Sequence, residues 1–220
     1  MNLSSDTLSV LKNFSDINQN LLIKPGNKVQ TISTMKNILA EAEVSEKFES
    51  EFAIYDLPEF LRSVELFDKP ELKFNGGGYV NISKGNSRGI KYFFADKSVI
   101  VSPSKGINMP DKHVTFTLKK DDFTDLMKGA TTLNLPDISV VGKGGNISIV
   151  ATDKKNKSSN TYSVNVGETD KEFTAYFRTE NFKQIVDDYD VAISKAKISH
   201  FVNRNKAVQY WIALEPDSEF

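Results

Sequence analysis

The sequence predicts an α+β protein of two similar domains, each with two helices packed on antiparallel sheets. Two observations carry this prediction. A capping residue followed by a short amphipathic stretch occurs four times, with helix starts near positions 4, 56, 120 and 179. A spacing of about 50 to 65 residues is long for a solenoid unit but suits repeated subdomains of one helix and several strands. Between these stretches, strand-like runs recur every ~8 to 12 residues, which is typical of antiparallel sheets.

Each of the four helical stretches is amphipathic. They cover 4–14, 56–64, 121–128 and 179–186. In the last stretch and just beyond it, the apolar residues at helical spacing are Phe182, Ile185, Val186 and Tyr189. Such a stripe predicts a helix that covers a sheet. Each opposite face carries a basic residue with acidic neighbours, and the pattern alone favours a solvated face of mixed charge.

Glycine-containing turns separate the predicted strands, because glycine adopts the positive φ angles that tight hairpins need. The three turns are Pro25–Asn27, Asn75–Gly78 and Gly142–Gly145. We therefore expect antiparallel hairpins that join 21–23 to 29–32, 71–74 to 79–83, and 138–141 to 146–150. Further strands are predicted at 89–94, 98–101, 113–118, 197–202 and 207–214.

An extended segment, Ser102–Asp111, interrupts this pattern near the middle of the 220-residue chain. Helices and sheets do not readily accommodate its two prolines and its glycine. The sequence therefore predicts an N-terminal domain over 1–101, a connector over 102–112 and a C-terminal domain over 113–220.

Composition narrows the function classes. The absence of cysteine excludes disulfides, thiolate metal sites and cysteine nucleophiles, and is typical of an intracellular setting. No apolar run approaches the ~20 residues of a membrane span, and no signal peptide is expected. With 28 basic against 29 acidic residues, the net charge is -1. Proteins that hold DNA through many phosphate contacts usually carry a basic excess, so any relation to nucleic acid must be local, weak or topological.

The candidate motifs give neither a catalytic constellation nor a metal site. Gly142–Gly145 lacks the spacing of a phosphate loop, and no helix is expected after it. The two histidines, His113 and His200, lie in strand-like segments without triad-spaced or ligand-spaced neighbours. The paired acids Asp121–Asp122 and Asp187–Asp188 are expected on exposed helical faces, without the desolvation that a general acid needs. The sequence therefore predicts a non-enzymatic protein without cofactors.

Three stretches carry a resemblance to a known family. They are Leu11–Asn18, Ala53–Leu61 and the acidic, aromatic C-terminal stretch Tyr210–Phe220. In order and spacing they resemble the trimeric DNA sliding clamps of tailed bacteriophages, the processivity factors of phage DNA polymerases. Length, repeat number and connector position agree with that family across the chain.

The resemblance implies a DNA-clamp fold in which three chains close head to tail into a pseudo-sixfold ring around duplex DNA. Twelve helices would line the hole and a continuous antiparallel sheet would form the outside. A topological link needs no tight phosphate grip, which agrees with the near-zero net charge. The residues expected to face the DNA backbone, without reading bases, are Lys12, Arg62, Lys119, Lys120, Lys128 and Lys183.

The resemblance also implies a pocket for short partner peptides beneath the connector and beside the last strand. It maps onto Ile107, Met109, Ala213, Leu214 and Pro216. An alternative is that Ile107 and Met109 only pin the connector to its domain. The expected partners are the phage DNA polymerase, an ATP-driven clamp loader and late-transcription factors, in the cytoplasm of the infected bacterial host. A β-rich virion structural or adaptor protein is the alternative function, and a small hydrolase is disfavoured by the motif search.

Overall fold

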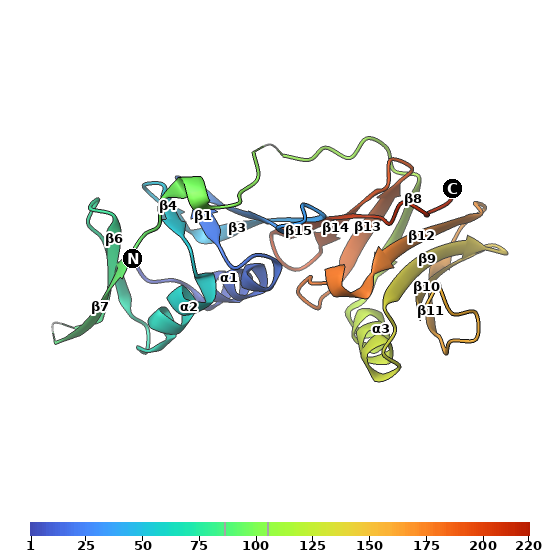
Figure 1. Cartoon of the computed structure of the whole chain (residues 1–220), viewed down its shortest axis with the longest axis horizontal. Helices are drawn as coiled ribbons and strands as arrows, with labels where there is room; N and C mark the ends of the chain where they lie inside the picture. The colour runs from blue at the N-terminus through green and yellow to red at the C-terminus, as the bar shows by residue number, and fades with distance from the viewer. Residues whose placement is uncertain (86, 105) are drawn as a thin grey trace. The chain divides into compact units, whose positions relative to one another are not determined.

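The computed structural model of the chain describes residues 1–85, 87–104 and 106–220, and its contacts divide the chain into two units. The first unit is Met1–Gly106 and the second is Ile107–Phe220. The division falls inside the segment predicted as a connector, in which Lys105 lies outside the described residues. Figure 1 shows the chain coloured from its N-terminus to its C-terminus. In the part that the structure describes, no helix is long and apolar enough to cross a membrane.

The first unit combines two α-helices with three sets of antiparallel strands. Its helices are α1 (Ser5–Ile17), α2 (Leu57–Glu65) and the short 3-10 helix η1 (Lys97–Val99). Its strands are β1 (Leu21–Ile23), β2 (Gly26–Ile32), β3 (Ile38–Phe48), β4 (Phe52–Ile54), β5 (Glu71–Phe74), β6 (Tyr79–Lys84) and β7 (Arg88–Phe93). Strand β1 pairs with β4, β2 pairs with β3, and β5, β6 and β7 form a sheet in that order.

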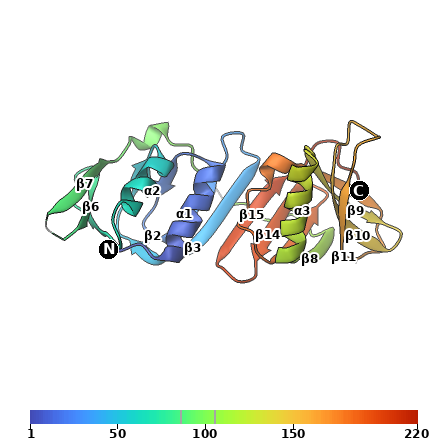
Figure 2. The same cartoon turned by 90° about the horizontal axis from the view of Figure 1, so that it is seen from below.

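Local sequence determines where both helices of the first unit begin. The Ser4 hydroxyl accepts a hydrogen bond from the Thr7 N–H ahead of α1. The Asp56 carboxylate accepts one from the Glu59 N–H, at 2.7 Å, ahead of α2. These N-caps satisfy amide groups that the helices leave free. The helices lie side by side and pack together (Figure 2), so that their polar faces share one surface. Their buried residues are Thr7, Val10, Leu11, Phe14, Ile17, Leu57, Phe60, Leu61 and Val64.

In the part that the structure describes, the second unit has one α-helix and two antiparallel sheets. Its helices are α3 (Lys120–Thr132) and the 3-10 helix η2 (Thr179–Asn181). Its strands are β8 (Val114–Leu118), β9 (Asp137–Lys143), β10 (Asn146–Thr152), β11 (Tyr162–Glu168), β12 (Phe173–Arg178), β13 (Tyr189–Ser194), β14 (Ile198–Asn203) and β15 (Val208–Ala213). One sheet has the order β11-β10-β9-β12, and β8, β13, β14 and β15 pair in that order.

The predicted fourth helix is wrong. Of the stretch 179–186, only one 3-10 turn is helical, and Arg178 before it supplies no side-chain cap. The backbone of Ile185 is instead held by two tyrosines: its N–H donates to the Tyr210 hydroxyl at 3.3 Å, and its carbonyl accepts from the Tyr189 hydroxyl at 2.6 Å. Tyr189 itself begins β13. Hydrogen bonds with tyrosine hydroxyls thus replace the helical ones, and the second unit has one α-helix among its described residues where two were expected.

Of the remaining strand predictions, some are confirmed and two are wrong. The glycine-turn hairpins β5–β6 and β9–β10 are confirmed, and Gly144 and Gly145 take positive φ angles of 59° and 85° between β9 and β10. The hairpin across Pro25–Asn27 is wrong, because β1 and β2 find different partners. The strand predicted at 98–101 is also wrong. Asp96 caps a 3-10 turn there by accepting a hydrogen bond from the Ser98 N–H at 2.8 Å.

Candidate functional site

Basic side chains stand on the exposed faces of the two helices of the first unit. Lys12 lies on the face of α1 opposite the buried stripe, and Arg62 holds the equivalent place on α2. Acidic residues share each face. Asp16 follows Lys12 by one turn, and Glu59 precedes Arg62 by one turn. The two cations therefore stand on one surface, each with a carboxylate nearby.

Helix α3 carries the basic residues of the second unit. Lys119 precedes the helix, Lys120 begins it and Lys128 lies two turns further on, and all three are exposed. The Asp188 carboxylate caps this helix by accepting a hydrogen bond from the Lys120 N–H at 2.7 Å. An acidic side chain at this position also complements the helix dipole. The start of α3 is thus fixed by a residue 68 positions away in the sequence.

Two sequence expectations about the segment after η2 need correction. Lys183 is half-buried and lies outside any α-helix, so it does not belong to a helical face. Asp187 was expected to be exposed but is buried. Burial acts to raise the pKa of Asp187, but hydrogen bonds from Asn205 and from the Asp188 N–H lower it overall. This carboxylate is a structural acceptor that organises the irregular segment.

Each α-helix of the described residues, α1, α2 and α3, carries a net negative charge. Helices α1 and α2 each hold two acidic residues and one basic residue, and α3 holds three acidic and two basic residues, so each helix has a formal charge of -1. A helical face with this charge cannot bind a polyanion tightly through its overall field. It can offer single cations to single phosphates, a weak contact with a shallow salt dependence.

The residues predicted to form a peptide pocket fall into two groups. Ala213 ends β15, Leu214 is buried and Pro216 is exposed. The Leu214 N–H donates a hydrogen bond to the Lys197 carbonyl, and the Lys197 amine donates one to the Pro216 carbonyl. Ile107 and Met109 are both half-exposed in the segment before β8. Among the described residues, no hydrogen bond or ring contact joins those two side chains to the other three.

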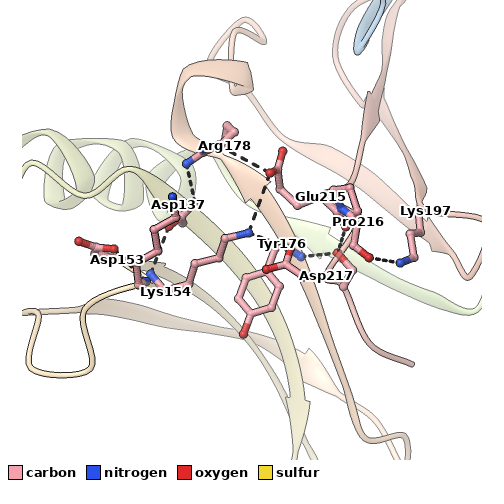
Figure 3. A network of polar contacts seen from close by, with 11 residues as sticks. Asp137, Asp153, Lys154, Tyr176, Arg178, Lys197, Glu215, Pro216 and Asp217 are labelled. Atoms are coloured by element: carbon pink, nitrogen blue, oxygen red, sulfur yellow. Dashed lines mark hydrogen bonds and ion pairs between the residues drawn. The ribbon is translucent and has the colours of Figure 1, made fainter.

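Beyond β15, the C-terminal tail folds back along β12 and is held by a polar network that the sequence did not reveal (Figure 3). The Arg178 guanidinium lies 3.3 Å from the fully buried Asp137 carboxylate and 3.7 Å from that of Glu215. The Lys154 amine lies 2.8 Å from the Asp217 carboxylate, and this hydrogen bond holds the pKa of Asp217 below its usual value. A charged cluster therefore fixes the tail on the second unit.

The structure identifies the open sheet edges. At one edge of its sheet, β5 is covered because Leu72 exchanges two backbone hydrogen bonds with Met1. In the second unit, β12 is covered because Thr174 exchanges two backbone hydrogen bonds with Glu219. For the opposite edges, β7 and β11, no outer backbone partner is found within the described residues. Unpaired edges of this kind are templates for another strand.

The register shows which groups those open edges present. Hydrogen-bonded and non-bonded pairs alternate along an antiparallel ladder. Because the backbone groups of Leu72 point away from β6, alternation across the sheet points the backbone groups of Gly89, Lys91 and Phe93 outward from β7. The backbone groups of Thr174 likewise point away from β9. The same alternation, followed across β9 and β10, therefore points the backbone groups of Ser163 and Asn165 outward from β11.

Side chains on β7 are partly ordered by a cation–π contact. The Lys91 ammonium lies 3.9 Å from the centre of the Tyr79 ring and 4.9 Å from that of Phe93, which is 67% exposed.

No group of three or more potential ligands among the described residues could hold a metal ion.

Comparisons with known proteins cover nearly the whole chain. Residues 4–102 match the family of DNA polymerase processivity factors, and residues 115–216 match the C-terminal domain of the gp45 sliding clamp. The chain is 34% identical to the sliding clamp of Vibrio phage KVP40, over 98% of this chain and 99% of that protein. It is 32% identical to the sliding clamp of Escherichia phage RB69, over 99% of this chain and 98% of that protein.

Solved structures share the fold at low sequence identity. The proliferating cell nuclear antigen (PCNA) of Thermococcus kodakaraensis superposes with a TM-score of 0.70 at 14% identity, over 98% of this chain and 99% of that one. A PCNA2–PCNA3 complex from Sulfolobus tokodaii gives a TM-score of 0.65 at 12% identity, over 94% and 95% of the two chains. The predicted α+β fold is thereby confirmed.

Proposed function

The chain belongs to the family of phage sliding clamps, the processivity factors of DNA polymerases, and we propose that it works as a closed ring of three copies around duplex DNA. The observation that carries the proposal is the match to phage sliding clamps over nearly the whole chain. The alternative of a virion structural protein has no support from these comparisons.

The ring closes by strand addition between the open edges at β7 and β11. Strand β7 of one copy pairs with β11 of the next, and these strands have similar lengths of 6 and 7 residues. The edges lie in different units, so the contact is head to tail and can be repeated until the ring closes. Three copies bring nine α-helices to the assembly, because each chain supplies three among its described residues where four were expected.

The ring holds DNA by enclosure and only weakly by charge. Lys12, Arg62, Lys119, Lys120 and Lys128 face the phosphate backbone, and Lys183 adds a cation from outside the helices. The net charge of -1 on each helix keeps this contact weak enough for sliding. No bases are read, so binding is independent of sequence. The protein itself catalyses no reaction.

Partner proteins act through the ring in the cytoplasm of the infected host. An ATP-driven clamp loader opens and closes it on DNA, and the phage DNA polymerase is tethered by it. Late-transcription factors use the same tether. Their short peptides dock against the connector residues Ile107 and Met109 and against Ala213, Leu214 and Pro216 at the end of β15.

The test is polymerase stimulation on primed circular DNA with the cognate polymerase and loader. We expect the double variant Arg62→Glu with Lys128→Glu to reduce stimulation at least about tenfold, since two phosphate contacts per copy become repulsive. The matched control is Lys143→Glu, a reversal at the end of β9 next to the hairpin turn, which leaves stimulation unchanged. Full stimulation by the double variant would contradict the assignment of these helices to DNA.

A further inference from the structure

A cavity of about 680 Å³ opens in the first unit between the β3–β4 turn and the β5–β6 hairpin. Three phenylalanines line it: Phe48, Phe52 and Phe74. The Phe52 ring is close to both of the others, with centroid distances of 5.6 Å to Phe48 and 5.0 Å to Phe74. None of these residues belongs to the DNA-facing helices or to the proposed peptide pocket at the end of β15.

One wall of this cavity is the outer edge of β5, part of which is already occupied by another segment of chain. The Leu72 N–H donates to the Met1 carbonyl at 2.7 Å, and the Met1 amine donates to the Leu72 carbonyl at 3.0 Å. Met1 therefore sits on β5 as one residue of an antiparallel strand. In Figure 1 the N-terminus accordingly lies beside this sheet.

The next position along the same edge is vacant. Alternation along the ladder directs the backbone N–H and carbonyl of Phe74 to the edge that Leu72 uses, two residues away. Among the described residues, no backbone group pairs with Phe74 on that side. Since Met1, Leu72 and Phe74 all line the cavity, this open edge borders the aromatic surface directly.

Charge at the cavity rim argues against an ionic ligand. The charged lining side chains are Glu49 and Lys73, which are of opposite sign. The Lys73 amine also lies 3.3 Å from the Glu71 carboxylate. The Met1 ammonium also lines the cavity, and it donates to the Leu72 carbonyl. Since both cations already have an acceptor within the protein, the cavity is not built for a nucleotide, a phosphate or DNA. Its volume is within the ~300–1,000 Å³ usual for ligand sites, and the half-buried ring of Phe74 suits an apolar or aromatic group.

We propose that this cavity binds an extended peptide segment of a partner protein. The segment adds a strand to β5 at Phe74 and places an apolar or aromatic side chain in the cavity against the half-buried ring of Phe74, while Phe48 and Phe52 are buried. In this mode of recognition, main-chain hydrogen bonds supply affinity and a side-chain pocket supplies specificity. Each clamp copy then offers a second peptide site, distinct from the one at the end of β15.

The probe is a synthetic hexapeptide of alternating threonine and phenylalanine with both ends blocked. Added to the full-length 15N-labelled protein, it shifts the amide signals of Lys73, Phe74 and Asn75 and slows hydrogen exchange at the Phe74 amide. We expect a dissociation constant of about 1 mM or tighter. A second peptide has the same side chains but carries N-methyl groups on its phenylalanines, and it binds at least about tenfold more weakly because strand pairing is blocked.

Two variants locate the site. Phe74→Ser weakens peptide binding at least about tenfold, and Tyr55→Ser, which removes an exposed aromatic ring outside the cavity, leaves it unchanged. The comparison of the two peptides uses the unaltered protein, so it decides the question even where Phe74→Ser unfolds. Equal binding of both peptides, or an absence of shifts at Phe74, overturns the proposal. Neither result bears on ring closure or DNA binding.

Discussion

Replacing Lys91 with proline removes one outward N–H from β7 and leaves the β6–β7 ladder intact. The register places the Lys91 backbone groups on the free side of β7, while those of Ile90 and Tyr92 bond to β6. Proline also fits an edge strand when its missing N–H faces outward. The substitution therefore removes one hydrogen bond from the proposed subunit contact without disturbing the core of the first unit.

The size of the effect follows from the carbonyl left without a donor on the partner's β11. An unsatisfied backbone group buried in an interface costs about 1–3 kcal/mol. At about 1.4 kcal/mol per factor of ten, each subunit contact weakens roughly 5- to 150-fold. Three such contacts are affected in the ring, so the trimer dissociates at much higher protein concentration.

Sedimentation velocity over a dilution series measures this dissociation. The matched control is Lys91→Ala, which removes the charge and the contacts with Tyr79 and Phe93 but keeps the N–H. We expect Lys91→Ala to change assembly much less than Lys91→Pro. Identical dissociation of the proline variant, the alanine variant and the unaltered protein would refute the assignment of β7 as the assembly edge.

Three further predictions concern the second unit. Leu126→Ala empties a fully buried position under α3 and lowers the free energy of unfolding in urea by about 2–5 kcal/mol. Tyr189→Phe removes the hydroxyl that donates to the Ile185 carbonyl at 2.6 Å and costs about 1 kcal/mol in the same assay. Because the hydrogen bond from Lys154 lowers the folded-state pKa of Asp217, this pair stabilises tail docking above the ordinary carboxyl pKa of ~3.9 and loses that stabilisation as pH falls through the folded-state value.

The contradicting results are equally specific. If Leu126→Ala were as stable as the unaltered protein, α3 would not pack on the core as described. If Tyr189→Phe left the free energy of unfolding unchanged, the Tyr189 hydroxyl would not explain the non-helical path after η2. The pH effect is read from the Glu219 amide signal, and Asp217→Asn should abolish the step. A step that persists in Asp217→Asn belongs to another carboxylate.

Helices α1 and α2 begin at residues that are fixed by local chemistry. The caps at Ser4 and Asp56 lie within a few residues of the amides they satisfy, so α1 and α2 can be predicted from a short window. The exposed positions of Lys12, Arg62 and Lys128 followed from the same helical period. The stretch 179–186 has a similar pattern, but the hydroxyls of Tyr189 and Tyr210 hold its backbone in a non-helical path.

Features set by long-range pairing lay beyond the sequence pattern. The cover on β5 joins residues 71 positions apart, and the Arg178–Asp137 ion pair joins residues 41 apart. Neither contact leaves a periodic signal, so the free edges β7 and β11 and the tail network became visible only in the structure. The cavity beside Phe74 was missed for the same reason, because β3, β4 and β5 each contribute one phenylalanine to it.

Light scattering across a range of protein concentrations tests the central claim, a closed ring of three copies, most directly. The account predicts a molar mass near three times the 24.6 kDa of one chain, with dissociation only on dilution. A mass of one chain at every concentration would contradict the ring, and with it the assembly of β7 on β11.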